Sequence, residues 1–343
     1  MSDPRNTSDT RTTLAATQAS RRASLPEQIS DSPLRTALLE GLRERNAALD
    51  AIFYDIGTIS PAEAARIAPH LAAEGAIVVV PPSGEGELAL CRSVEDFVAY
   101  APDVDVLAVA GVGSSALGTA AFARNIADAI GRPVAGVVSG YGLSDLLTEA
   151  AGGFLWFGLL NHLRHCFEAF DRMTESGFVA EPPRSASTVS PARRSKDTQT
   201  VVALLEHPAL DIRMMSGHSK GNLVISEALF QIRHGHRARL LQLAQEATII
   251  TIGACIAMPR QMERVIDIMG SWDWFGGLNS RPSIRADIEV PGAWHHTNTE
   301  LAAHLPVTAT IRQALQSPRW AAAARPKPGG RPTGAARPLL RSV

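Results

Sequence analysis

The sequence contains very little cysteine. Only Cys91, Cys166 and Cys255 occur in 343 residues, and thiols this few and this scattered exclude both a disulfide framework and a cysteine-rich zinc site. Cys91 and Cys255 lie in or beside apolar stretches, which is typical of buried thiols. We therefore expect a protein of a reducing compartment, the cytoplasm.

Long apolar runs and an excess of one charge are also missing. No run of about 18 apolar residues occurs, so no transmembrane helix is predicted. No apolar segment follows the early positive charges, which argues against a secretory signal. With 33 Lys and Arg against 34 Asp and Glu, the net charge is −1. Because the whole chain then has no field that would attract a nucleic acid, we expect no specific nucleic-acid partner.

Both ends of the chain differ in composition from the stretch between them. Residues 1–31 are rich in Ser, Thr, Asp and Arg, and such a segment cannot bury enough surface to offset the entropy of ordering. Residues 318–343 combine basic side chains with Pro and Gly and contain no acid. We expect a disordered tail over 1–31, a folded domain over 32–317 and a disordered basic tail over 318–343.

Strand-like and helix-like stretches alternate between the tails, and 45% of the residues are hydrophobic, which is enough for a large core. This alternation predicts an α/β fold, a mostly parallel sheet with helices on both faces. The expected strands are 76–81, 87–92 at an edge, 104–110, 133–138, the run before Gly217, 247–253 and 264–270. The expected helices are 32–56, 60–73 with a capping box at its start, 93–100, an alanine-rich run from after Gly118 to about 130, 198–207 and 223–231.

The chain is organised around Gly217-His218-Ser219-Lys220-Gly221. An apolar run leads into this stretch and a helix-like segment follows, so Ser219 lies at the apex of a sharp strand-to-helix turn. The two glycines remove side chains that would clash where the helix and the strand cross closely. The pattern predicts an exposed nucleophile; the alternative is a serine that only caps the helix.

Candidate acids and bases follow this serine along the chain. Asp273 comes just after the last predicted strand, and His295 and His296 follow a glycine-containing turn. We expect Asp273 to orient the imidazole and His295 to take the proton from the serine. Asp267, inside a strand, is the second candidate for the acid, His296 is the rival base, and His304 is assigned to a surface helix.

These residues resemble the α/β-hydrolase superfamily, most closely its lipase- and esterase-like members. The resemblance is specific over 211–231, looser over 101–145 and 247–310, and absent at both ends. It implies a serine ester hydrolase with a triad of Ser219, Asp273 and a histidine, working through an acyl-enzyme without a metal or an organic cofactor. Polyester synthases resemble this fold with cysteine as the nucleophile, so a serine favours hydrolysis and leaves an acyltransferase as the alternative.

A glycine-rich loop, Gly111 to Gly118, follows the strand 104–110. It fits a dinucleotide fingerprint, but no acid for a ribose stands at the end of the next strand. The resemblance offers a second interpretation, in which Gly113 and Ser114 supply one N–H of an oxyanion hole and Lys220 supplies the other. The third is a plain strand-to-helix turn.

About 65 residues separate the next glycine turn from Asp211, more than one helix requires. Residues 146–173 are unusually apolar, and 174–196 are rich in Pro, Ser and Arg. We expect an insertion over about 146–197 that forms a helical cap or lid, with a helix pair packed permanently on the core as the alternative. An apolar cap predicts a hydrophobic acyl substrate, a lipid-like small molecule or a polyester.

Two further interpretations concern binding. His234 and His236 look like a metal patch, but neither carboxylate nor cysteine stands beside them, so we expect basic residues that interact with a helix dipole. The apolar insertion and the basic tail also allow a non-catalytic hydrolase-like protein that makes peripheral contact with a lipid, granule or anionic surface.

Overall fold

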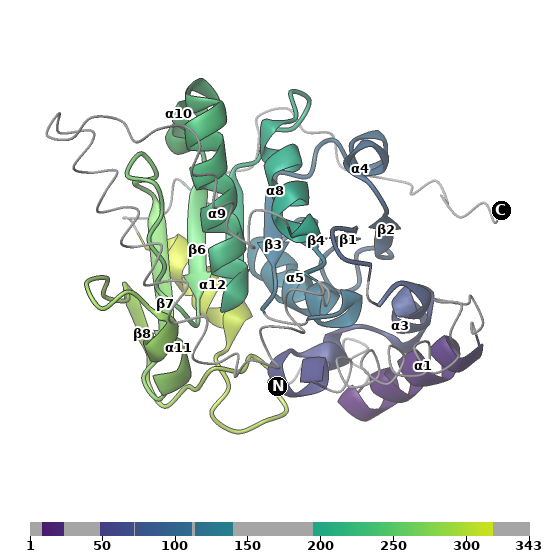
Figure 1. Ribbon diagram of the computed structural model, residues 1–343. Coiled ribbons are helices and arrows are strands. Elements are labelled where there is room, and N and C mark those ends of the chain that lie inside the picture. Colours follow the sequence, from purple (N-terminus) through teal and green to yellow (C-terminus); the bar gives the residue numbers. More distant parts are fainter. Residues whose placement is uncertain (1–8, 24–48, 72, 112–113, 140–194, 318–343) are drawn as a thin grey trace, which may run out of the picture.

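The computed structural model describes residues 9–23, 49–71, 73–111, 114–139 and 195–317 (Figure 1). Its centre is an eight-stranded sheet in the order β2-β1-β4-β3-β5-β6-β7-β8. Strand β1 runs antiparallel to both its neighbours, and all pairings from β4 to β8 are parallel. The strands are β1 (Ile77–Val80), β2 (Ala89–Cys91), β3 (Val106–Val109), β4 (Val134–Val137), β5 (Met214–His218), β6 (Thr248–Ile252), β7 (Val265–Gly270) and β8 (Ile288–Val290). The expected α/β architecture with a mostly parallel sheet is confirmed.

Helices cover both faces of this sheet because its strands are apolar on both sides. In β3, Val106 and Ala108 belong to one core cluster, and Leu107 and Val109 belong to the other. The first cluster includes α3 (Pro61–Ile67), α5 (Ala116–Ile130) and α12 (Val307–Gln316). The second includes α4 (Val94–Tyr100), α8 (Lys196–Glu206), α9 (Lys220–Gly235) and α10 (Arg237–Glu246). Short elements complete the fold: η1 (Ile56–Thr58), η2 (Ala68–His70) and α11 (Trp274–Asn279).

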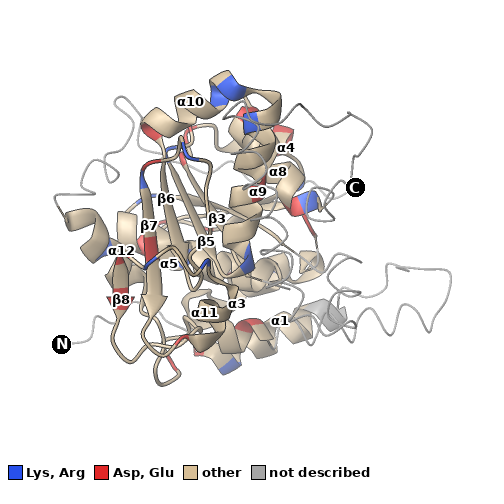
Figure 2. Cartoon of the chain, turned by 60° about the vertical axis from the view of Figure 1, so that its left-hand side comes forward, with Lys and Arg blue, Asp and Glu red and all other residues tan. Residues whose placement is uncertain are grey.

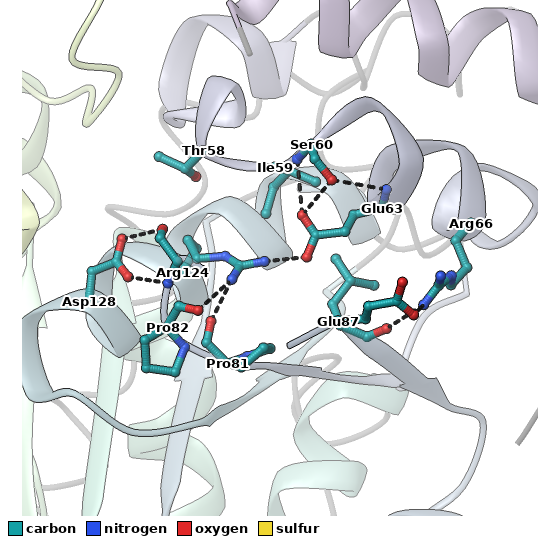
Figure 3. Close-up of polar contacts among 12 residues, drawn as sticks. Thr58, Ile59, Ser60, Glu63, Arg66, Pro81, Pro82, Glu87, Arg124 and Asp128 are labelled. Atoms are coloured by element: carbon teal, nitrogen blue, oxygen red, sulfur yellow. Dashed lines mark hydrogen bonds and ion pairs between the residues drawn. The ribbon is translucent and has the colours of Figure 1, made fainter. Parts of the chain in front are cut away.

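The predicted capping box at the start of α3 is present and also joins α3 to α5. The Glu63 carboxylate accepts the Ser60 N–H at 3.0 Å, and its other oxygen pairs with the guanidinium of Arg124 (Figure 3). The same guanidinium donates to the carbonyls of Pro81 and Pro82 at 2.7 and 3.1 Å. Arg124 is 2% exposed, and this buried charge is tolerated because it is paired and hydrogen-bonded. The loop after β1 is thereby fixed to α5.

The expectation of disorder over 1–31 is wrong for residues 10–23, which form helix α1 (Thr10–Ala23). Thr13 and Thr17 lie one helical turn apart and are buried, and the Thr13 hydroxyl donates to the Ile59 carbonyl at 2.8 Å. Leu14 packs against the core cluster that contains α3. The buried face is built from threonine, alanine and one leucine, so it lacks the strong apolar periodicity that predicts a docked helix.

Several expectations fall on residues outside the described ranges: the cap or lid from 146 to 194, the C-terminal tail and most of the helix predicted over 32–56. Within the described ranges, residues 49–53 are helical. None of the helices described there is both long and apolar enough to cross a membrane. Basic and acidic positions are interspersed over the fold, as Figure 2 shows, in keeping with the near-zero net charge.

Candidate active site

Ser219 stands between β5 and α9 in a strained backbone conformation, with φ 52° and ψ −118°. Residues other than glycine rarely adopt a positive φ, and such strain persists only where the surroundings enforce it. Here the surroundings are the two glycines of the turn. A Cβ on Gly221 would overlap the carbonyl oxygen of Val109, and a Cβ on Gly217 would lie 2.7 Å from the amide nitrogen of Asn222. The serine is therefore held on a tight turn at the carboxyl end of the central strand.

Neighbouring strand β6 holds this turn in place. The Ser219 amide donates to the Ile252 carbonyl at 2.9 Å. The Asn222 side chain donates to the carbonyls of Ile252 and Ala254, both at 3.0 Å. Because Asn222 is fully buried, these bonds fix the first turn of α9 to the end of β6.

Asp273 and His295 meet at the same edge of the sheet. Asp273 follows β7 and caps α11, where one carboxylate oxygen accepts the Gly276 N–H at 2.6 Å. Its other oxygen lies 2.8 Å from Nδ1 of His295. The carboxylate can only accept from Nδ1–H, so a neutral His295 carries its free lone pair on Nε2. The Phe275 ring stands edge-on to the imidazole, with centroids 4.7 Å apart, and closes one side of it.

The competing acid and base lie elsewhere. His296 directs Nε2 to the Ala302 carbonyl at 3.0 Å, and burial lowers the pKa of its imidazole. Asp267 accepts the Thr251 hydroxyl inside the sheet, and burial raises the pKa of its carboxyl to about 6. His304 lies in the segment before α12 rather than in a helix, and its Nδ1 is 2.9 Å from the Leu301 carbonyl. The structure thus brings Asp273 to His295 and leaves the alternatives apart.

The residue next to Ser219 contacts His295. The ring of His218, the residue before the serine, lies 4.9 Å from the His295 ring between centroids. A Cβ on Gly253 would lie 3.1 Å from Cε1 of His295, so the glycine after β6 makes room for the imidazole. Among the described residues, no hydrogen bond joins the Ser219 hydroxyl to His295. In serine hydrolases such bonds are often long or poorly aligned in the free enzyme and tighten in the substrate complex.

The expected oxyanion loop is described in part. Gly113 lies outside the described residues. Ser114 is buried and its amide donates to the Gly111 carbonyl at 3.3 Å. Lys220 is the first residue of α9, directly after the serine. Since β3 and β5 are parallel neighbours, the loop after β3 and the start of α9 lie at the same edge of the sheet.

A buried carboxylate that the sequence analysis missed occupies the N-terminus of α5. Asp50 accepts the amides of Ser115 and Gly118 at 3.0 and 3.2 Å. Burial, opposed by these hydrogen bonds, raises the pKa of the Asp50 carboxyl to about 7. A nucleotide phosphate at this helix end would have to displace the carboxylate, which disfavours the dinucleotide interpretation of the loop. No local sequence signal could have identified Asp50, because its partners lie more than 60 residues away.

One histidine of the pair His234 and His236 is paired with a carboxylate. His236 follows α9, and its Nδ1 lies 2.5 Å from the Glu206 carboxylate of α8. In the part of the chain that the structure describes, no three His, Cys, Asp or Glu side chains are grouped as metal ligands.

Comparison of the chain with protein-family models, with curated proteins and with solved structures found no match. Its function is therefore inferred from the geometry of the residues around Ser219.

Proposed function

We propose that this protein is a serine hydrolase that cleaves carboxylic esters with a hydrophobic acyl group. The observation that carries the proposal is the strained Ser219, held at φ 52° at the edge of the sheet where Asp273 and His295 are hydrogen-bonded. A serine that only caps a helix needs no such strain. N-cap residues have extended backbone angles, as Ser60, Ser93 and Ser115 do here.

The reaction follows from the protons that each group can hold. Nε2 of His295 takes the proton from the Ser219 hydroxyl while the serine oxygen attacks the ester carbonyl. Asp273 keeps Nδ1 protonated and stabilises the imidazolium that forms. The imidazolium then gives its proton to the leaving alcohol. Water, activated by the same histidine, releases the acid from the acyl-enzyme.

Backbone N–H groups would stabilise the oxyanion. We assign one to Lys220, which directly follows the serine, and one to the Gly113–Ser114 loop, because the chain leaves β3 at the same edge of the sheet as it leaves β5. Removing one such donor typically slows turnover by about 10²- to 10³-fold.

A hydrophobic substrate is supported by the side chains around the acid. Trp272 and Trp274 flank Asp273 in sequence and are 64% and 66% exposed. Trp274 begins α11, and Leu278 of that helix is 71% exposed. Exposed apolar side chains grouped within a few residues are typical of a surface that meets an apolar ligand. A lipid-like or polyester-like acyl group would cover them. The apolar sequence of residues 146–173 favours the same substrate class.

Labelling with a fluorophosphonate, followed by peptide mapping, tests the proposal. The probe should modify Ser219 in the wild type, and Ser219→Ala should abolish both labelling and hydrolysis of a p-nitrophenyl ester. Ser226→Ala is a matched control, because this serine of α9 donates to the Ala257 carbonyl and takes no part in the proposed reaction. A wild-type protein that is neither labelled nor active, or that is labelled on another peptide, would exclude the mechanism.

A further inference from the structure

Residues 50–54 contact three separate loops of the proposed active site. The segment forms a helical turn in which the Tyr54 amide donates to the Asp50 carbonyl at 2.7 Å. Side chains four residues apart on a helical turn lie on the same face. Asp50 and Tyr54 therefore reach toward the sheet together, and both are buried, with exposed fractions of 2% and 3%.

Asp50 and Tyr54 hold the two ends of the loop between β3 and α5. At its far end, the Asp50 carboxylate accepts the amides of Ser115 and Gly118. A Cβ on Gly118 would overlap that carboxylate, so only glycine fits there. At its near end, the Tyr54 hydroxyl accepts the Gly111 amide at 2.5 Å. The loop that we expect to supply an oxyanion N–H is thus attached at both ends to one helical turn.

Tyr54 also connects this loop to the turn that carries the serine. Its hydroxyl lies 2.9 Å from Nδ1 of His218, and Nε2 of His218 lies 3.0 Å from the His295 carbonyl. The Gly111 amide can only donate, so the tyrosine proton points to Nδ1. The His295 carbonyl can only accept, so His218 carries its proton on Nε2. The hydrogen bonds therefore run in one direction, from Gly111 through Tyr54 and His218 to His295.

Burial of His218 keeps the direction of these hydrogen bonds the same over a wide pH range. It lowers the pKa of the His218 imidazole to about 3, with the neighbouring His295 as the second cause. His218 is then neutral at every pH at which an esterase would be assayed. It has no lone pair left to act as a base, because Nδ1 accepts from Tyr54 and Nε2 is protonated.

The main chain of the same turn holds the loop that carries His295. The Phe53 carbonyl accepts both the amide and the hydroxyl of Thr297, at 2.8 and 2.9 Å. The Ala51 carbonyl accepts the Asn298 side chain at 2.6 Å. The Phe53 ring also stands edge-on to the His295 ring, with centroids 6.3 Å apart.

We propose that Tyr54, with Asp50 and His218, positions the oxyanion loop relative to His295 and so sets the geometry of the proposed reaction. None of the three is assigned contact with the substrate, so they are positioning residues. The inference rests on the proposed function, since it needs a reaction whose rate depends on that geometry. A misplacement of about 1 Å at a reacting centre can cost on the order of 100-fold in rate.

The central experiment compares Tyr54→Phe with Tyr100→Phe. Tyr100 ends α4, which packs beside the edge strand β2, and serves as the matched control. For a p-nitrophenyl ester, Tyr54→Phe should lower kcat by about 10- to 100-fold and leave KM within about twofold, because positioning acts on the transition state. The rate of fluorophosphonate labelling at Ser219 should fall by a similar factor. Tyr100→Phe should match the wild type in kcat, in KM and in the rate of labelling.

A second pair of variants separates the hydrogen bonds from packing. His218→Gln keeps an N–H that can reach the His295 carbonyl, and His218→Leu keeps only apolar volume. We expect the kcat of the glutamine variant to be about fivefold or more above that of the leucine variant. This ratio corresponds to one retained hydrogen bond of about 1 kcal/mol.

The outcomes of these experiments are distinct. A wild-type protein that is not labelled at Ser219 overturns the proposed function and the positioning role together. A labelled wild type with an unchanged kcat in Tyr54→Phe, or with equal kcat in the two His218 variants, overturns the positioning role alone.

Discussion

Asp273 holds His295 through one carboxylate oxygen, at 2.8 Å from Nδ1, while its other oxygen accepts the Gly276 amide at 2.6 Å. The carboxylate therefore cannot rotate away from the imidazole without losing the cap of α11. Orientation of the proposed base is built into the start of a helix, and the acid, the base and the serine can each be tested separately.

The strain at Ser219 predicts a gain in stability when the side chain is removed. Ser219→Gly should abolish ester hydrolysis and raise the free energy of unfolding by about 1 kcal/mol. A strained residue costs about 1–3 kcal/mol, and the freedom of glycine in the unfolded chain offsets part of the relief. Thermal and urea unfolding would measure the gain.

The control for this variant is Ala303→Gly, at the other positive φ outside glycine among the described residues, 59°. It should stabilise the protein similarly and keep its activity. A Ser219→Gly protein less stable than the wild type would show that the turn is not strained.

The histidine doublet should respond unequally to substitution. His295→Ala should reduce kcat by about 10⁴-fold or more, because it removes the proposed base. His296→Ala should have a much smaller effect, since the imidazole of His296 bonds the Ala302 carbonyl and, among the described residues, has no hydrogen bond to Ser219, Asp273 or His295. Initial rates with a p-nitrophenyl ester decide between them, and an inactive His296→Ala beside an active His295→Ala would reverse the assignment.

The two aspartates should separate activity from stability. Asp273→Asn should lower turnover by about 10⁴-fold, because the amide favours the wrong tautomer of His295. Asp267→Asn should leave turnover nearly unchanged and alter the pH dependence of unfolding.

The sign of that pH effect follows from burial. The pKa of the Asp267 carboxyl is about 6 in the folded protein and about 3.9 in an unfolded chain. The folded state therefore binds more protons between these values, and this carboxyl lowers stability as pH rises from about 4 to 6. Urea titrations should show Asp267→Asn gaining stability relative to the wild type over that window. A difference in the free energy of unfolding that does not change with pH over this window would contradict the argument that burial raises the pKa of Asp267.

Helix α1 should contribute to stability. Deleting residues 1–23 removes the bond from Thr13 to Ile59 and exposes the surface under Leu14, so Tm should fall by roughly 3–8 °C. Ala19→Ser, on the exposed face of α1, should change Tm by about 1 °C or less. An unchanged Tm after the deletion would restore the expectation of a dispensable tail.

Much of the sheet could be predicted because its strands are short apolar runs separated by turn residues. The expected runs at 76–81, 104–110 and 247–253 each contain an observed strand. Strand β8 was not expected, since its three residues alternate between half-buried and exposed and carry little apolar signal. Asp273 was preferred to Asp267 as the acid because it lies beyond the end of its strand. The hydrogen bond between Asp273 and His295 is compatible with that preference. The catalytic roles of Asp273 and His295 stay predictions.

The role of residues 50–54 could not be predicted, because it depends on contacts with residues that are distant in the sequence. Asp50 and Tyr54 belong to a stretch whose spacing indicates only a helix. Their partners at Ser115 and Gly111 are 65 and 57 residues away, and nothing in the local pattern connects them. A single sequence reports periodicity and turn chemistry well, and it does not report which buried polar groups will meet.

The bonds from residues 51 and 53 to Asn298 and Thr297 join parts of the chain that are 247 and 244 residues apart. Contacts of such high separation form late, because a long loop must close before they contribute. During synthesis, the turn at residues 50–54 leaves the ribosome long before its partners exist. The loop that carries His295 can therefore be fixed only after the rest of the chain has been made, and in refolding experiments we expect ester hydrolysis to return with the slowest phase.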